Sequence, residues 1–351
     1  MKPWEKYFRK VEPYVPGEQP KLSKMIKLNT NENPYPPSVK VEKTLREADL
    51  ERLKMYPDPT SEILVKELAK RYGVQEEQVF VGVGSDDVLG MSFLTFFGSD
   101  KPILFPDITY SFYDVWAELF KIPYKTPALD EDFRIVKEDY YEANGGVIIT
   151  NPNAPTSIYE DLDFIRDILD HNQDVVVIVD EAYIDFGGKS ALELLPEYEN
   201  LLVVQTFSKS RSMAGMRIGY AFGSPSLIKA LNDVKYSYNS YTMNYITLLT
   251  GVASLQDEAY FKKCCEKIIA TRERVKKELK ELGFSFPDSK TNFLFATHEK
   301  VPAVELFEAL RKANIFVRYF NKPRIDNRLR ITIGTDEEMD VLLAFLRNYL
   351  K

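Results

Sequence analysis

The sequence is poor in the residues that build metal centres and histidine-based catalytic sites. Among 351 residues it has 2 histidines, His171 and His298, and 2 cysteines, the adjacent Cys264 and Cys265. So few candidate ligands, none of them clustered, exclude a zinc site, and the shortage of histidine argues against catalytic triads. The adjacent cysteines are expected to be reduced, which is typical of a cytoplasmic protein.

Long apolar runs and blocks of like charge are also lacking. Residues 1–6 have no apolar core of the kind found in signal peptides, and no stretch reaches membrane-spanning length. The net charge is −7, with acidic and basic residues interleaved, so nothing predicts binding to nucleic acid or to a membrane. The composition, 44% hydrophobic and 28% charged, is that of a soluble globular protein.

Strand and helix patterns alternate from residue 79 onwards, which predicts an α/β domain with a mostly parallel sheet. The expected strands of this domain are 79–83, 102–105, 146–150, 175–179, 201–204 and 218–222. Near residue 235 the pattern changes, and the chain continues with a long amphipathic helix at 257–282 and shorter strands at 292–296, 315–319 and 328–333. We predict a large domain over residues 38–238 and a smaller α+β domain formed by residues 1–37 and 239–351.

A basic loop after one of these strands, residues 206–219, carries the first candidate for chemistry. Its Lys209 lies among small hydroxylated residues, with Arg217 eight positions further on. Hydroxyls and cations at the end of a strand can hold a phosphate, and a lysine kept beside it partly out of water can act as a nucleophile. Lys209 would then form a Schiff base with a phosphorylated aldehyde cofactor. Taken alone, the loop is equally consistent with a solvated basic surface.

Polar residues follow other expected strands, at the edge where doubly wound sheets bind ligands. Asp180 ends a strongly apolar strand and needs a cation, for which a protonated pyridine nitrogen would serve. Taken alone, Asp180 is more simply a helix N-cap. The turn at residues 84–86 offers a phosphate seat at a helix N-terminus. Because these groups and Lys209 would meet at one edge of the sheet, we favour a functional site.

Together these motifs resemble those of fold-type I aminotransferases that depend on pyridoxal 5'-phosphate. The similarity lies in residues 206–219, 180–183 and 151–156, and it extends over nearly the whole chain. Within that superfamily the chain most resembles the histidinol-phosphate aminotransferase family, on residues 28–34, 56–58, 84–87, 180–183 and 329–334. The resemblance implies an α/β fold with a mostly parallel seven-stranded sheet and a smaller α+β domain.

The resemblance also implies a role for each candidate residue. Lys209 would bind the cofactor and move a proton, Asp180 would pair with the pyridine nitrogen, and Tyr183 would hydrogen-bond the phenolic oxygen. Further expected cofactor contacts are Ser85, Asp86, Tyr110, Asn153, Thr206, Ser208 and Arg217, with Tyr56 contributed by the neighbouring subunit of a homodimer. The expected substrate contacts are Tyr14, Asn33, Arg318 and Arg330.

The activity implied is the transfer of an amino group between L-histidinol phosphate and 2-oxoglutarate, which gives imidazole acetol phosphate and L-glutamate in histidine biosynthesis. A threonine-phosphate decarboxylase and an aromatic amino-acid aminotransferase are alternatives on the same scaffold. The chain departs from the family at Ala154, where asparagine is usual, at Ser157, where glycine is usual, and at Asp87, where glutamate is more frequent. Since that asparagine normally bonds the phenolic oxygen, either Asn153 replaces it or Tyr183 acts alone.

Overall fold

A seven-stranded sheet forms the centre of the computed structural model, which describes residues 2–15, 17–20 and 25–351. The strands lie in the order β2-β8-β7-β6-β5-β3-β4. Their bounds are β2 (Val79–Gly82), β3 (Ile103–Leu104), β4 (Tyr124–Lys125), β5 (Gly146–Thr150), β6 (Val177–Asp180), β7 (Leu201–Thr206) and β8 (Gly219–Phe222). Strands β3 to β7 pair in parallel, whereas β8 is antiparallel to both of its neighbours. The predicted mostly parallel seven-stranded sheet is confirmed.

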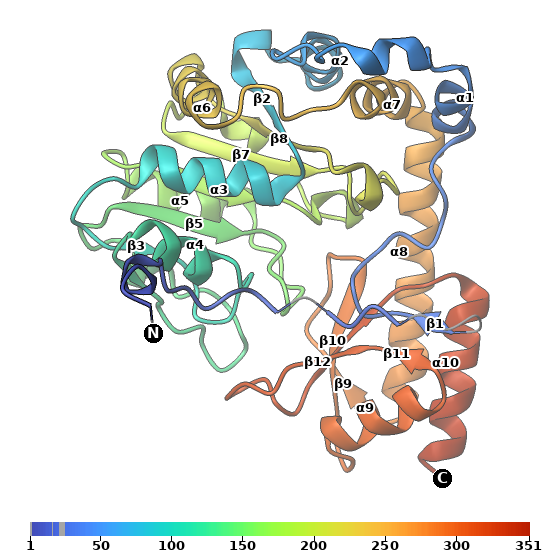
Figure 1. Ribbon diagram of the computed structural model, residues 1–351. Coiled ribbons are helices and arrows are strands. Elements are labelled where there is room, and N and C mark those ends of the chain that lie inside the picture. The colour runs from blue at the N-terminus through green and yellow to red at the C-terminus, as the bar shows by residue number, and fades with distance from the viewer. Residues whose placement is uncertain (1, 16, 21–24) are drawn as a thin grey trace.

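Helices cover both faces of this sheet (Figure 1), because its strands are apolar on both sides. One face packs against α3 (Ser85–Phe96), α4 (Tyr113–Phe120) and α6 (Pro225–Tyr238). The opposite face packs against α5 (Leu162–Asp170). A further apolar cluster contains residues of β2 and β8 and joins them to α1 (Val39–Glu47), α2 (Glu62–Tyr72) and α7 (Tyr245–Leu255).

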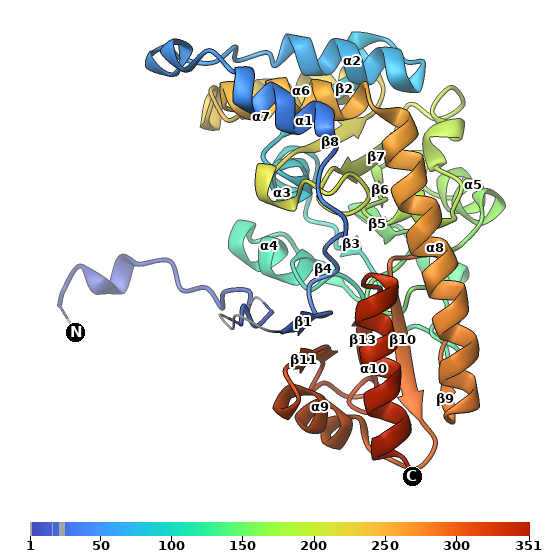
Figure 2. The same ribbon diagram turned by 90° about the vertical axis from the view of Figure 1, so that its right-hand side faces the viewer.

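A smaller α+β domain follows, joined to the first by the long helix α8 (Glu258–Glu281), which runs beside both domains (Figures 1 and 2). Its antiparallel sheet has the order β12-β13-β10-β9. The remaining bounds are β9 (Phe284–Ser285), β10 (Phe293–His298), α9 (Ala303–Lys312), β11 (Ile315–Phe316), β12 (Arg318–Tyr319), β13 (Leu329–Thr332) and α10 (Asp336–Tyr349). Strand β1 (Ile26–Lys27), in the N-terminal arm, pairs in parallel with β11.

Some boundaries differ from those predicted. The strand expected at 175–179 is β6, Val177–Asp180, which includes the acid at its end. The single strand expected at 315–319 is two strands that join different sheets. The domain boundary at residue 238 stays a prediction, and α7, which lies beyond it, packs on α1 and α2. None of the helices in the described part of the chain is long and apolar enough to cross a membrane.

Candidate active site

A cavity of about 180 Å³ opens at the carboxyl ends of β6 and β7. Its lining residues are Thr30, Glu32, Ser85, Asp86, Tyr110, Thr150, Ala154, Asp180, Ala182, Tyr183, Thr206, Ser208, Lys209, Ala214 and Arg217. The structure therefore brings together the candidate groups that the sequence placed at several separate strand ends. This is the edge at which parallel α/β sheets bind ligands.

Asp180, the last residue of β6, is 3% exposed. Burial raises the pKa of its carboxyl group to about 6, and hydrogen bonds from the Tyr113 hydroxyl and the Ala182 backbone oppose this rise. Tyr113 lies 2.8 Å from the Asp180 oxygen and 2.6 Å from the Thr150 hydroxyl. Among the described residues, no ion pair neutralises Asp180. The carboxylate is thus an acceptor for a cation that enters the cavity.

The N-terminus of α3 lies against Arg217, and Ser85 and Arg217 both line the cavity. Gly84 has φ +85°, and a Cβ there would lie 2.4 Å from the Arg217 guanidinium, so only glycine fits. No side chain caps this helix, which leaves the first N–H groups after Gly84 available to an anion. The Ser85 and Ser208 hydroxyls line the same corner of the cavity. Helix N-terminus, hydroxyls and guanidinium together form a seat for a phosphate.

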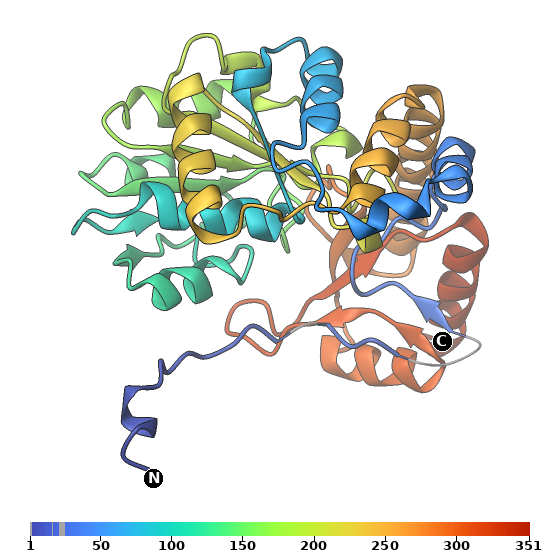
Figure 3. The ribbon, with the colours of Figure 1, turned by 45° about the horizontal axis from the view of Figure 1, so that its top comes forward.

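Asp86 and Tyr110 close one side of the cavity. The Tyr110 hydroxyl donates to one Asp86 oxygen at 2.7 Å, and Arg217 lies 3.1 Å from the other oxygen. Burial, reinforced by the nearby Asp86 charge, raises the pKa of Tyr110. Its hydroxyl therefore stays protonated, and its ring lines the cavity as an uncharged surface. Tyr14, on the N-terminal arm, stacks on Phe112, with ring centroids 4.1 Å apart. Figure 3 shows the outer part of this arm reaching away from both domains.

Lys209 follows β7 and is held by contacts from the arm. Its Nζ donates to the Thr30 carbonyl at 3.2 Å. The Asn33 amide donates to the backbone carbonyls of Lys209 and Ser210, at 3.0 and 3.1 Å. The Ser210 hydroxyl donates to the half-buried Asp185 carboxylate at 2.5 Å. These bonds fix the lysine backbone while its amine remains at the cavity surface.

Arg330, on β13, and Arg318, on β12, lie opposite each other in the small sheet. Arg330 donates to the Asn29 carbonyl at 2.9 Å, and its buried Nε has no hydrogen-bond partner among the described residues. Burial lowers the pKa of Arg330, and the neighbouring Arg318 adds to this effect. Neither guanidinium forms an ion pair within the described chain, in contrast with the acidic partner commonly found for such residues. The pair is therefore suited to an anion from outside the protein.

Six of the expected site residues do not line the cavity: Tyr14, Arg318 and Arg330, described above, and Asn153, Asn33 and Tyr56. The amide of Asn153 is occupied by the Ile108 carbonyl and by the hydroxyls of Thr109 and Thr156, at 2.8–2.9 Å. Asn33 contacts the lysine backbone, as described above. Tyr56 is 83% exposed and stacks on Tyr241, so in this single chain it faces solvent.

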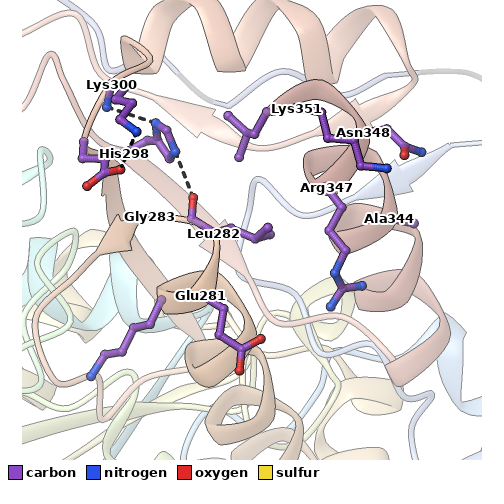
Figure 4. Close-up of a pocket in the computed structure, with 12 residues that line it drawn as sticks. Glu281, Leu282, Gly283, His298, Lys300, Ala344, Arg347, Asn348 and Lys351 are labelled. Carbon is purple, nitrogen blue, oxygen red and sulfur yellow. Dashed lines mark hydrogen bonds and ion pairs between the residues drawn. The ribbon is translucent and has the colours of Figure 1, made fainter.

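Both histidines have structural contacts outside the cavity. His171 stacks on Tyr141, with ring centroids 3.7 Å apart. His298 accepts from the backbone of Lys300 at 3.2 Å and lies 2.9 Å from the Leu282 carbonyl (Figure 4). It borders an open depression of about 820 Å³ at the far end of the small domain, which shares no lining residue with the cavity around Lys209.

Several residues that contact the site were not singled out from the sequence. Tyr113 donates a hydrogen bond to Asp180. The sequence indicates this role only through the position of Tyr113 at the start of α4. Asn31, Thr30 and Glu32 belong to a motif that carried the resemblance, residues 28–34, but no role was assigned to them. Their contacts join positions far apart in the chain, which no local pattern reveals.

Comparison with known proteins agrees with this geometry. The model of the aminotransferase class I and II family matches residues 23–346. A histidinol-phosphate aminotransferase from Lactococcus lactis is 53% identical over 348 residues, which cover 99% of this chain and 98% of the relative. The crystal structure of histidinol-phosphate aminotransferase from Sinorhizobium meliloti in complex with pyridoxal-5'-phosphate has a TM-score of 0.82 at 23% identity, over 92% of this chain and 91% of that one. L-threonine-O-3-phosphate decarboxylase from Porphyromonas gingivalis has a TM-score of 0.79 at 20% identity, over 93% and 99%.

Proposed function

The chain belongs to the class I and II aminotransferase family, and we propose that it interconverts L-histidinol phosphate plus 2-oxoglutarate and imidazole acetol phosphate plus L-glutamate. The relatives that match this chain along nearly its whole length are named as histidinol-phosphate aminotransferases, and the other three reactants are part of this proposal. It places the enzyme in histidine biosynthesis. The shared fold alone would not separate this activity from decarboxylation of a phosphorylated amino acid.

The cavity fits pyridoxal 5'-phosphate on two observations. Asp180 is a buried carboxylate without a cationic partner in the described chain, which suits a protonated pyridine nitrogen. The uncapped start of α3, with Ser85, Ser208 and Arg217, suits the phosphate. Bound there, the cofactor would supply a carbonyl that exchanges the amino group and a ring that withdraws electrons from the reacting carbon.

The chain's own residues would perform the remaining steps. Lys209 Nζ would hold the cofactor's aldehyde carbon and, once released by substrate, carry a proton away from the substrate carbon that bears nitrogen. Asp180 would keep the pyridine nitrogen protonated. Tyr110 would cover the ring face, and Tyr183 would hydrogen-bond the phenolic oxygen. Because the Asn153 amide is occupied elsewhere, we assign this last contact to Tyr183 without Asn153.

One observation carries the substrate assignment: Arg318 and Arg330 form a pair of cations without an acidic partner in the described chain. Guanidinium groups bind phosphates and carboxylates in the same bidentate manner. The pair would therefore hold the phosphate of histidinol phosphate in one half-reaction and a carboxylate of glutamate in the other. Tyr14 would close this end of the site, and Asn33 would hold the lysine loop below the substrate.

We further propose a homodimer in which Tyr56 reaches the cofactor phosphate of the neighbouring subunit. Leu50, Leu53 and Met55 precede Tyr56 and are 66%, 56% and 55% exposed, which is a large apolar surface for a free monomer. A cytoplasmic location is proposed on the adjacent cysteines, both of which are buried and unbridged.

A substrate-competition assay tests this function. Glutamate formed from 2-oxoglutarate is measured with L-histidinol phosphate, phenylalanine or O-phosphothreonine as the amine, and carbon dioxide release is measured with O-phosphothreonine. We expect kcat/KM for histidinol phosphate to exceed that for phenylalanine by at least about 10²-fold, because phenylalanine lacks the phosphate that the two arginines would hold. Faster turnover of phenylalanine, or release of carbon dioxide, would overturn the assignment. The Lys209→Ala variant is the control for background reaction.

A further inference from the structure

Asn31 joins the N-terminal arm to the small domain and also contacts the cavity. It is 1% exposed and has a left-handed backbone, with φ +56°. Its backbone N–H donates to the Thr332 hydroxyl at 3.1 Å, and its carbonyl accepts from the Asn292 amide at 2.9 Å. Its side-chain amide lies 2.9 Å from the hydroxyl oxygen of Tyr183. Asn31 is therefore fixed from one side and meets the active-site phenol on the other.

The Thr332 hydroxyl determines which way the Asn31 amide faces. This hydroxyl already accepts the Asn31 backbone N–H, so its own proton is available for the Asn31 Oδ1, 3.1 Å away. With Oδ1 turned toward Thr332, the NH₂ group faces Tyr183. Asn31 is therefore the donor in this contact, and the oxygen of Tyr183 accepts.

The Tyr183 hydroxyl has one proton, and the contact with Asn31 limits the acceptors to which it can donate that proton. A hydroxyl oxygen that accepts from Asn31 cannot also donate to it, and no acceptor for the Tyr183 proton lies within reach among the described residues. Tyr183 lines the cavity together with Asp180 and Lys209. Its proton is thus left for an acceptor inside the cavity.

We propose that Asn31 is a positioning residue that makes Tyr183 an obligate hydrogen-bond donor to the phenolic oxygen of the cofactor. The inference rests on the proposed function, since it takes the cavity to hold pyridoxal 5'-phosphate. It also accounts for a site in which Ala154 lines the cavity and the Asn153 amide is occupied elsewhere. Tyr183 would serve alone there because Asn31 fixes the direction of its proton.

Two substitutions separate this role from a purely structural one. Asn31→Asp keeps the size of the side chain and tolerates the left-handed backbone, but it offers Tyr183 an acceptor in place of a donor. The phenol proton would then turn away from the cavity. Asn31→Gly tolerates the same backbone and removes the side chain altogether, which leaves Tyr183 free to point either way. If Asn31 had only a structural role, glycine should weaken cofactor binding more than aspartate does. The proposal predicts the reverse order.

The test uses the holoenzyme, with pyridoxal 5'-phosphate as the ligand, and measures two properties other than turnover. These are the dissociation constant of the cofactor, from quenching of protein fluorescence, and the pH midpoint of its visible absorption band. For Asn31→Asp we expect binding to weaken about 10- to 100-fold, the range for losing a hydrogen bond to a charged group, and the midpoint to rise. For Asn31→Gly we expect binding within about threefold of the parent.

The same substitutions in a Tyr183→Phe background complete the test, and there aspartate and glycine should differ by no more than about twofold. Two results would overturn the inference and leave the proposed function intact. One is an Asn31→Asp variant that binds the cofactor no more weakly than Asn31→Gly; the other is a difference between the two variants that persists in the Tyr183→Phe background. If the parent itself binds no pyridoxal phosphate, both fall. If the aspartate variant does not fold, Thr332→Val is tested in its place, because it removes the hydroxyl proton that orients the Asn31 amide. This variant should raise the pH midpoint of the cofactor's absorption band, and an unchanged midpoint would refute the proposal.

Discussion

Replacing Asp180 by asparagine is expected to have opposite effects on the protein without cofactor and on the protein with cofactor. Without cofactor, the buried carboxylate of Asp180 has no cation beside it in the described chain, and burial raises its pKa from 3.8 to about 6. Asparagine carries no charge and has the same shape. Its amide can donate to Tyr113, whose hydroxyl then donates to Thr150. The variant should therefore be more stable than the parent when the cofactor is absent.

The size of the effect follows from the pKa. A rise of about two units corresponds to about 3 kcal/mol of lost stability once the group is ionised in both the folded and unfolded states. Because the folded pKa lies above the unfolded value, the loss is absent below about pH 4, grows between pH 4 and pH 6, and is complete above it. For 351 residues, about 3 kcal/mol corresponds to a difference in melting temperature of about 4 °C.

Calorimetry of the cofactor-free protein at pH 4 and pH 8 measures this difference. Asp180→Asn should melt about 4 °C above the parent at pH 8 and at nearly the same temperature at pH 4. It should bind pyridoxal phosphate at least about 10²-fold more weakly, because a buried ion pair is lost. Asp100→Asn, at an exposed position, is the control and should change neither property. A variant that is less stable than the parent at pH 8 would refute the reasoning.

The remaining predictions concern Lys209, Arg330 and Tyr56. Lys209→Ala should lose at least about 10³-fold in kcat yet melt within about 2 °C of the parent in the cofactor-free state, since within the described chain its Nζ hydrogen-bonds only the Thr30 carbonyl. Appreciable turnover by this variant would contradict the role of Lys209. Arg330→Gln should raise KM for histidinol phosphate about 10²-fold, because a contact with the phosphate is lost, and an unchanged KM would refute that contact. The melting temperature should not fall, because the cation that is removed has no acidic partner in the described chain. A mixture of Tyr56→Ala and Lys209→Ala subunits should recover about a quarter of the parental activity, because about half of the dimers are mixed and each of these has one complete site. No recovery would place Tyr56 in its own subunit's site.

Much of the site could be predicted because its chemistry lies where strands end. The apolar, β-branched run before Asp180 marked a central strand, and the position of the acid at its end implied a partner. Lys209 and Arg217 were found in the same way, after β7. The position of these groups directly after a strand is enough to predict that they lie close together in the fold.

Contacts between distant parts of the chain could not be predicted. The pairing of Asn31 with Tyr183 depends on how the arm packs against the small domain, and so does the lack of an acid beside Arg330 among the residues that the structure describes. Asn153 lies in a recognisable motif, yet its amide donates to the Ile108 carbonyl and the Thr156 hydroxyl, and the spacing of the motif does not reveal these contacts. The split of residues 315–319 between two sheets has the same origin, because the pairing of β1 with β11 involves the N-terminal arm.

The central claim is that Lys209, Asp180 and the two arginines form an aminotransferase site for histidinol phosphate. The most direct test is a single half-reaction, in which L-histidinol phosphate is added to the holoenzyme without any oxo acid and the visible absorption of the bound cofactor is followed. We predict that this absorption is lost with formation of one equivalent of imidazole acetol phosphate per site, and that 2-oxoglutarate restores it. An absorption that does not change with L-histidinol phosphate, but is lost with phenylalanine or O-phosphothreonine, would contradict the account.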